Sequence, residues 1–189
     1  MPTPTIRRPI LIGANPLVSL FDGDVTTCFA SIWLVEWSTR GRGEAMVLWH
    51  EGQLRVLGAD PDLAWWLAQD FTRHFPEARG LAWPEHPTVE RARVAIDLDM
   101  SAGLRAEAAA VVVSMSGVLD RRVFDTDAFD LSGVPHGLSL VTAPVSHATI
   151  TVAGRRLPGE VRVSGTPDRP SSSGFLTSAE VWWRPSGDH

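Results

Sequence analysis

The feature that most constrains the fold of this chain is a series of apolar, β-branched and aromatic runs separated by glycine-containing turns. The longest run spans residues 26–39, and a hairpin turn is expected at residues 40–43. Residues 44–50 and 54–57 continue the series across a second turn at residues 51–53. Because such runs favour extended backbone and glycine allows tight reversals, the pattern predicts an antiparallel meander.

Further strands are predicted on the same grounds in the rest of the chain. They span residues 89–100, 104–118, 138–142, 148–152, 157–163 and 175–183. One amphipathic helix is predicted over residues 60–75, since Asp60 can cap its start and Pro61 fits its first turn. Residues 1–25 contain four prolines and are expected to be irregular, while residues 165–174 are expected to form a flexible loop.

These elements together predict a mainly β (α+β) fold. We expect the meander to curl into a barrel-like or conical sheet, with the helix packed on a face or an opening. A two-sheet sandwich is the alternative. A length of 189 residues favours one domain covering the whole chain. At the level of strand pattern alone, the expected architecture resembles lipocalin-like barrels, some of which act as cyclases in bacterial secondary metabolism.

The composition removes several classes of chemistry. All 17 basic residues are arginines and tyrosine is absent, so no lysine can form a Schiff base or reach nucleotide phosphates from a glycine loop. A net charge of −5 argues against a nucleic-acid partner. A lone cysteine, Cys28, permits no internal disulfide, and the apolar stretch near the amino terminus is too short for a signal peptide or a membrane span. We therefore expect a cytoplasmic protein with no membrane partner.

The eight tryptophans are the richest positive signal. If the first hairpin closes through a four-residue turn, Trp37 lies opposite Met46, and Trp33 lies opposite His50. The shared face is then apolar, with His50 as its only ionisable member. Such a face suits either a small-molecule pocket or an ordinary core. The residues predicted to contact a ligand are Trp33, Trp37, Met46, Leu48, Trp66 and Trp183.

The reverse face of the same hairpin is also largely apolar. It carries Ile32, Leu34, Val47, Trp49 and Leu57 beside the charged Glu36 and Arg55. A sheet that is apolar on both faces must be covered on both. The second cover would be the predicted helix or another subunit, and we expect a homodimer.

Three residues are candidates for acid or base chemistry. His50 would be the proton-transferring group of the tryptophan face, while Asp97 and Asp99 project from one side of a strand. The competing interpretation of the aspartates is a solvated ion pair, because a turn at residues 101–103 would bring Arg105 near Asp99. That register also places Glu107 near Asp97. The histidine spacing matches no metal motif, and we expect neither a metal nor a cofactor.

The sequence thus predicts a protein that binds an apolar small molecule in a tryptophan-lined barrel cavity, and that could act as a cofactor-independent cyclase or isomerase. One alternative is a non-catalytic binding or oligomerisation protein whose tryptophans form core and interface. Another is a hydrolase or lyase that uses Asp97 and Asp99.

Overall fold

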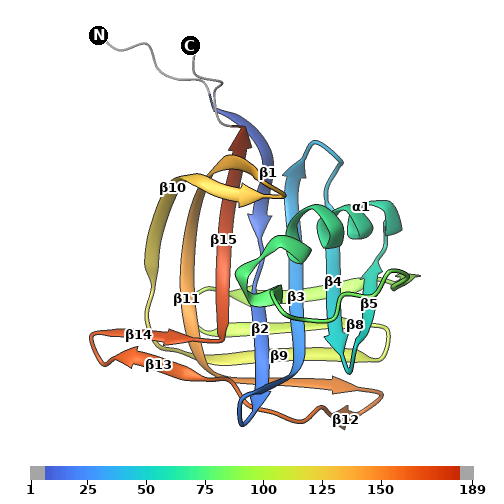
Figure 1. Ribbon diagram of the computed structural model, residues 1–189, viewed down its shortest axis with the longest axis vertical. Coiled ribbons are helices and arrows are strands. Elements are labelled where there is room, and N and C mark those ends of the chain that lie inside the picture. The colour runs from blue at the N-terminus through green and yellow to red at the C-terminus, as the bar shows by residue number, and fades with distance from the viewer. Residues whose placement is uncertain (1–6, 184–189) are drawn as a thin grey trace.

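A computed structural model describes residues 7–183 and confirms a mainly β fold with one helical segment packed on a large curled sheet (Figure 1). The main path of the sheet runs in the order β6-β5-β4-β3-β1-β15-β11-β9-β8-β7, with β2, β10 and β12 joined at its sides. The strands are β1 (Arg8–Ala14), β2 (Leu17–Asp22), β3 (Val25–Ser38), β4 (Gly43–His50), β5 (Gln53–Gly58), β6 (Thr88–Arg91), β7 (Val94–Asp99), β8 (Gly103–Ala108), β9 (Val111–Val118), β10 (Arg122–Leu131), β11 (Val134–Val152), β12 (Arg155–Arg156), β13 (Val163–Thr166), β14 (Arg169–Ser172) and β15 (Gly174–Trp183).

The helical segment begins where the sequence predicts. Asp60 Oδ1 accepts hydrogen bonds from the backbone N–H groups of Asp62 and Leu63, which caps α1 (Pro61–Trp66). The backbone then widens into the π-helical turn η1 (Leu67–Phe71) and tightens into the 3-10 turns η2 (Thr72–His74) and η3 (Pro76–Ala78). No helix among residues 7–183 is both long and apolar enough to cross a membrane.

The register of the first hairpin differs from the predicted one. Trp33 lies opposite Ala45 and Ile32 lies opposite Met46, because the pairing with β4 ends at Val35, opposite Gly43, and the residues of β3 beyond Val35 have no partner in β4. The observed pairing of β3 with β4 is displaced from the predicted one by an odd number of residues, so each residue of β4 lies on the opposite face of the sheet from the one predicted. Trp33 therefore shares its face with Val47 and Trp49, whereas Met46, Leu48 and His50 lie on the other side.

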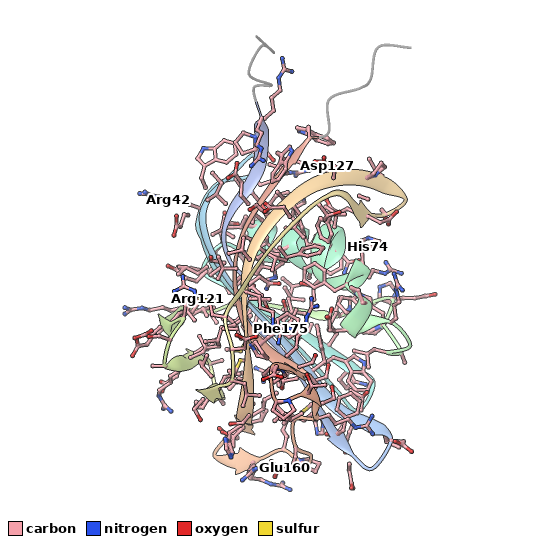
Figure 2. The ribbon with its side chains drawn as sticks, turned by 90° about the vertical axis from the view of Figure 1, so that its left-hand side faces the viewer. Arg42, His74, Arg121, Asp127, Glu160 and Phe175 are labelled. Atoms are coloured by element: carbon pink, nitrogen blue, oxygen red, sulfur yellow. The ribbon has the colours of Figure 1, made fainter. Side chains whose placement is uncertain are left out.

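Both faces of this hairpin are covered within the chain. The Trp33 face packs against the helical segment and β10. The Met46 face packs against β7, β8, β9 and the second half of β11, which run across β2–β5 behind them in Figure 1. Figure 2 shows the helical segment on one side of the sheet and the β7–β9 layer on the other. The second cover that we assigned to the helix or to another subunit is thus β7–β9, so the double apolar face gives no reason to expect a homodimer.

Most of the described part of the amino-terminal segment is not irregular, contrary to the prediction for residues 1–25, of which residues 1–6 lie outside the described residues. Residues 8–22 form two strands at the centre of the sheet, where β1 pairs with β15 and β3, and β2 pairs with β3. Pro9 and Pro16 are tolerated in this segment because Pro9 lies at a register shift and Pro16 lies between the two strands. The buried apolar side chains of Leu11 and Val18 then supply the packing energy.

Other segment boundaries also differ. The predicted strand over 89–100 is two strands, β6 and β7, and the one over 104–118 is a hairpin that turns at Ala109, whose φ is 50°. Residues 157–163 are largely outside strands, and residues 165–174 belong mainly to the short β13–β14 hairpin and the start of β15. The strand β10 was not predicted.

A single long strand, β11, connects the two layers. Its first half pairs with β15 and its second half pairs with β9. Pro144 lies between the segments predicted over 138–142 and 148–152, at the point where β11 changes partner, and this position tolerates its missing N–H. Its carbonyl oxygen accepts from the Leu119 N–H at 2.8 Å. The first half of β11 therefore faces the helical segment and contributes to the cavity below.

Candidate functional site

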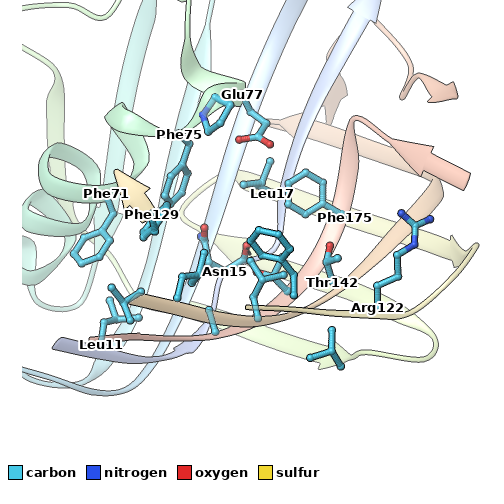
Figure 3. Close-up of a pocket in the computed structure, with 18 of the residues that line it drawn as sticks. Leu11, Asn15, Leu17, Phe71, Phe75, Glu77, Arg122, Phe129, Thr142 and Phe175 are labelled. Carbon is cyan, nitrogen blue, oxygen red and sulfur yellow. Dashed lines mark hydrogen bonds between the residues drawn. The ribbon is translucent and has the colours of Figure 1, made fainter. Parts of the chain in front are cut away.

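A cavity of about 470 Å³ lies on the helical side of the sheet (Figure 3). One wall is formed by β1, β11 and β15, and the facing side by the helical segment and β10. Aromatic side chains dominate the lining: Trp33, Phe71, Phe75, Phe124, Phe129 and Phe175. This volume is within the range that holds small organic ligands.

The sheet wall follows from strand alternation. On β15, every second residue from Phe175 to Val181 borders the cavity, and on β11 Leu138, Leu140 and Thr142 do the same. The residues between them face the other side. The wall is therefore rigid, because each of these side chains is fixed by a paired backbone.

Aromatic contacts tie the helical segment to this wall. The ring of Trp33 lies 5.7 Å from that of Phe71, edge to face, and 6.0 Å from that of Phe75. Trp66 meets Phe71 from the other side at 5.1 Å. Such geometries are favourable for aromatic pairs beyond the burial itself. The π-helical turn carries Phe71 into this position.

A buried polar network fixes Asn15 in the otherwise apolar wall. Asn15 Nδ2 donates to Ser31 Oγ and to the carbonyl oxygen of Ile32, both at 2.9 Å. Ser31 Oγ lies 3.3 Å from Thr72 Oγ1, which in turn accepts from Trp33 Nε1 at 3.0 Å. The carbonyl oxygen of Ile32 can only accept a hydrogen bond, so the Asn15 side-chain atom that contacts it must be the amide nitrogen.

This network leaves the carboxamide oxygen of Asn15 available. Only 6% of Asn15 is exposed, the residue borders the cavity, and Oδ1 has no hydrogen-bond partner in residues 7–183. Thr177 fixes the Asn15 backbone, with its Oγ1 donating to the Asn15 carbonyl at 2.7 Å. Asn15 therefore presents a positioned acceptor for a hydroxyl or N–H group inside the cavity.

Glu77 is the acidic residue that borders the cavity. It lies in η3, directly after Pro76, and Figure 3 shows its carboxyl group pointing in beside Leu17 and Phe175. Burial raises the pKa of Glu77, against smaller opposing effects of its own backbone N–H and the charge of Arg79. A carboxyl group with a raised pKa holds its proton at a higher pH than an exposed one, which suits a group that must donate a proton and then accept one.

Arginines border the cavity at another place. Arg122 begins β10 opposite Thr142, and Arg169 begins β14. Arg122 Nε donates to Asp120 Oδ2 at 2.5 Å, and its Nη2 donates to the carbonyl oxygen of Pro170. Arg122 therefore holds the β13–β14 hairpin beside the cavity.

Among the predicted ligand contacts, Trp33 is the one that borders this cavity. Met46 and Leu48 are buried in the core on the opposite face, and Trp37 is 46% exposed. Trp66 and Trp183 border a neighbouring hollow of about 350 Å³, which shares Phe71 with the main cavity and also contains the buried His136. The main cavity is thus lined by phenylalanine and aliphatic side chains, and the hairpin register turns Met46 and Leu48 away from it.

The predicted acid and base residues lie outside the cavity. His50 Nδ1 lies 3.0 Å from the carbonyl oxygen of Thr27 at the far end of β4. Asp97 and Asp99 are exposed on β7. Asp99 accepts from the hydroxyl and the backbone N–H of Ser101, and these bonds lower its pKa. The register is also two residues from the predicted one, so that Arg105 lies opposite Asp97 and forms an ion pair with Glu107.

Sequence reasoning missed Asn15 and Glu77. Asn15 is the only asparagine of the chain, which was a usable signal, but it lies in the segment expected to be irregular. Glu77 lies in a proline-rich connection without periodicity. Within residues 7–183, no group of three or more His, Cys, Asp and Glu side chains is arranged to hold a metal ion.

Comparison of the chain with models of known protein families, with curated proteins and with solved structures finds no match. The argument for function therefore depends on the cavity alone.

Proposed function

We propose that this protein binds a largely apolar small molecule in the phenylalanine-lined cavity. The observation that carries the proposal is an apolar space of about 470 Å³ into which a buried asparagine presents an unpaired acceptor oxygen. Apolar walls supply affinity, and one positioned polar atom fixes orientation. An ordinary core would have filled the space, because voids cost stability.

We further propose that the bound molecule is isomerised or cyclised without a cofactor, with Glu77 as the proton-exchanging group. The protonated carboxyl group donates its proton to one atom of the ligand, and the resulting carboxylate removes a proton from another. Protons balance in this cycle and no oxidant or reductant is needed. The aromatic walls would hold the ligand in a reactive conformation, which by itself can lower a barrier by several kcal/mol.

Binding is tested with N-phenylnaphthylamine, a neutral apolar dye whose fluorescence rises on transfer from water. Ala179 borders the cavity, whereas Ser178 faces the other side of the same strand. Ala179→Phe should fill the cavity and abolish the fluorescence rise, and Ser178→Phe is the matched control that should keep it. Equal binding by both variants, or no binding by the unmodified protein, would contradict the proposal.

Catalysis is tested on ligands that displace the dye. Each is incubated with the protein in deuterated water and followed by proton NMR. The proposal expects deuterium incorporation or rearrangement with the unmodified protein and loss of it in Glu77→Gln, which should still bind the dye. Binding without any proton exchange would favour the non-catalytic binding protein. Neither Asp97 nor Asp99 borders the cavity, so this mechanism does not use them.

A further inference from the structure

The cavity has a cationic end and an apolar end along β11. Arg122 lies opposite Thr142, whereas Thr126 lies opposite Leu138 and Phe129 lies opposite His136. Figure 3 shows Arg122 beside Thr142 and Phe175, with Phe71 and Phe129 at the opposite side. The four residue steps from Leu138 to Thr142 correspond to about 13 Å of extended chain. The cavity therefore suits an elongated molecule whose two ends differ in polarity.

The guanidinium of Arg122 retains free donors at this end. Its Nε is bound to Asp120 and one N–H of Nη2 to Pro170, and no partner of Nη1 is found in the described part of the chain. A guanidinium has five N–H donors in a planar fork that matches the oxygens of an anion. Arg122 can thus bind an anionic group while it keeps its structural contacts.

Arg169 supplies a second guanidinium with an exposed side chain. The pKa of Asp120 is lowered mainly by its hydrogen bond from Arg122, with smaller effects that include the charges of Arg122 and Arg169. Asp120 is the carboxylate bound to Arg122, and burial disfavours the charged form of Glu77, whose carboxyl group points in beside Phe175. This end therefore has an excess positive charge, although the chain as a whole carries −5. A positive end on an acidic protein favours an anionic ligand.

We infer that the ligand is an amphipathic organic acid, whose anionic group lies at Arg122 and Arg169 and whose apolar body extends toward Phe71 and Phe129. The inference rests on the proposed function, because it names the class of molecule that the same cavity takes. It also gives the ligand one orientation, in which the acid end is at the β13–β14 hairpin.

Two dyes with the same apolar body test this assignment. Anilinonaphthalene sulfonate carries an anionic group that N-phenylnaphthylamine lacks. The unmodified protein should bind the sulfonate more tightly, and Arg169→Gln should weaken sulfonate binding by about three- to fivefold while leaving the neutral dye unchanged. Arg155→Gln, which removes the same charge from exposed β12, is the control and should change neither dye. Added salt should reduce the sulfonate preference.

The outcomes separate this inference from the proposed function. If neither dye binds, the cavity proposal itself is wrong. If the neutral dye binds and Ala179→Phe abolishes its binding, but the sulfonate shows no advantage or Arg169→Gln does not reduce it, the acid assignment alone is overturned. Arg169→Glu is a second variant, and it should weaken sulfonate binding further than Arg169→Gln.

Two aliphatic ligands then test whether the cavity prefers an organic acid. Dodecanoate and dodecanol have equal chains and differ in the head group. Dodecanoate should displace the neutral dye at a lower concentration, and Arg169→Gln should narrow that difference. Equal displacement by the acid and the alcohol, unchanged in Arg169→Gln, would overturn the assignment. Arg122→Gln is expected to have a larger effect, but it also removes contacts to Asp120 and Pro170, so Arg169 carries the test.

Discussion

The indole Nε1 of Trp33 donates a hydrogen bond to Oγ1 of Thr72 over 3.0 Å, which joins the sheet wall of the cavity to its helical side. Both side chains are buried, and Thr72 also contacts the Ser31 hydroxyl that accepts from Asn15. The position of the helical segment and the orientation of the Asn15 oxygen are therefore set by one connected network. Removal of any member should affect both stability and the shape of the cavity.

Thr72→Val tests the energetic weight of this network. Valine keeps the shape of threonine but leaves Trp33 Nε1 buried without an acceptor, which should lower the free energy of unfolding by about 1–3 kcal/mol. Urea denaturation measures the change. The control is the Trp33→Phe background, in which Thr72→Val should cost clearly less. An equal cost in both backgrounds would show that the two residues are not coupled.

Glu77→Gln should change how stability depends on pH. Burial raises the pKa of Glu77 above its ordinary value of 4.5, so the folded protein holds this proton more tightly than the unfolded chain does. The stability of the unmodified protein should then fall, relative to the variant, as pH rises from about 4.5 through the raised pKa. Denaturation at a series of pH values measures the difference.

The matched control for Glu77 is Glu85→Gln, which removes an exposed carboxylate from the same connection. It should show little change in the pH dependence. A parallel pair of curves for the unmodified protein and Glu77→Gln across the whole range would contradict the raised pKa.

Cys28 should be unreactive in the folded protein. Burial raises the pKa of its thiol to about 11, and the side chain is fully buried in the core between β3 and the β7–β9 layer. Because the thiolate is the reactive form, a thiol reagent in mildly alkaline solution should not modify it until denaturant is added. Mass spectrometry counts the adducts, and rapid modification without denaturant would contradict the packing described.

Asp60→Ala should weaken the start of the helical segment. The carboxylate caps two backbone N–H groups, and its loss should cost about 1 kcal/mol of unfolding free energy. Asp60→Asn is the control, since an asparagine oxygen can cap in the same way. Thermal unfolding measures both variants, and an Asn variant as unstable as the Ala variant would assign the effect to charge instead of capping.

Elements whose signals lie within a few consecutive residues were predicted correctly from the sequence. The strands β3, β4, β5 and β15 and the capped start of α1 were predicted nearly to their observed bounds, because strand propensity, glycine turns and an N-cap act over a few residues. The split of residues 104–118 into β8 and β9 was missed, since the turn at Ala109 uses alanine in a conformation for which alanine gives no signal.

The cavity residues depended on pairings between distant segments. Phe175 and Leu140 border the same cavity because β15 pairs with β11, and Thr72 is linked to Asn15 through Ser31 of β3. Neither arrangement can be predicted from a sequence pattern, because residues that come together across strands have no fixed spacing along the chain. The same holds for Glu77, whose raised pKa arises from burial that its sequence neighbours do not predict.

The sequence by itself determined that this chain forms a mainly antiparallel β structure with one capped helix, and that no lysine or tyrosine is present to take part in a reaction. Tertiary structure decided which side of each strand faces the cavity. The reason is that side chains alternate along a strand, so an odd shift in register reverses every one of them. In the register observed here, β3 pairs with β4 only as far as Val35, and its last residues pair with β1 on the other edge.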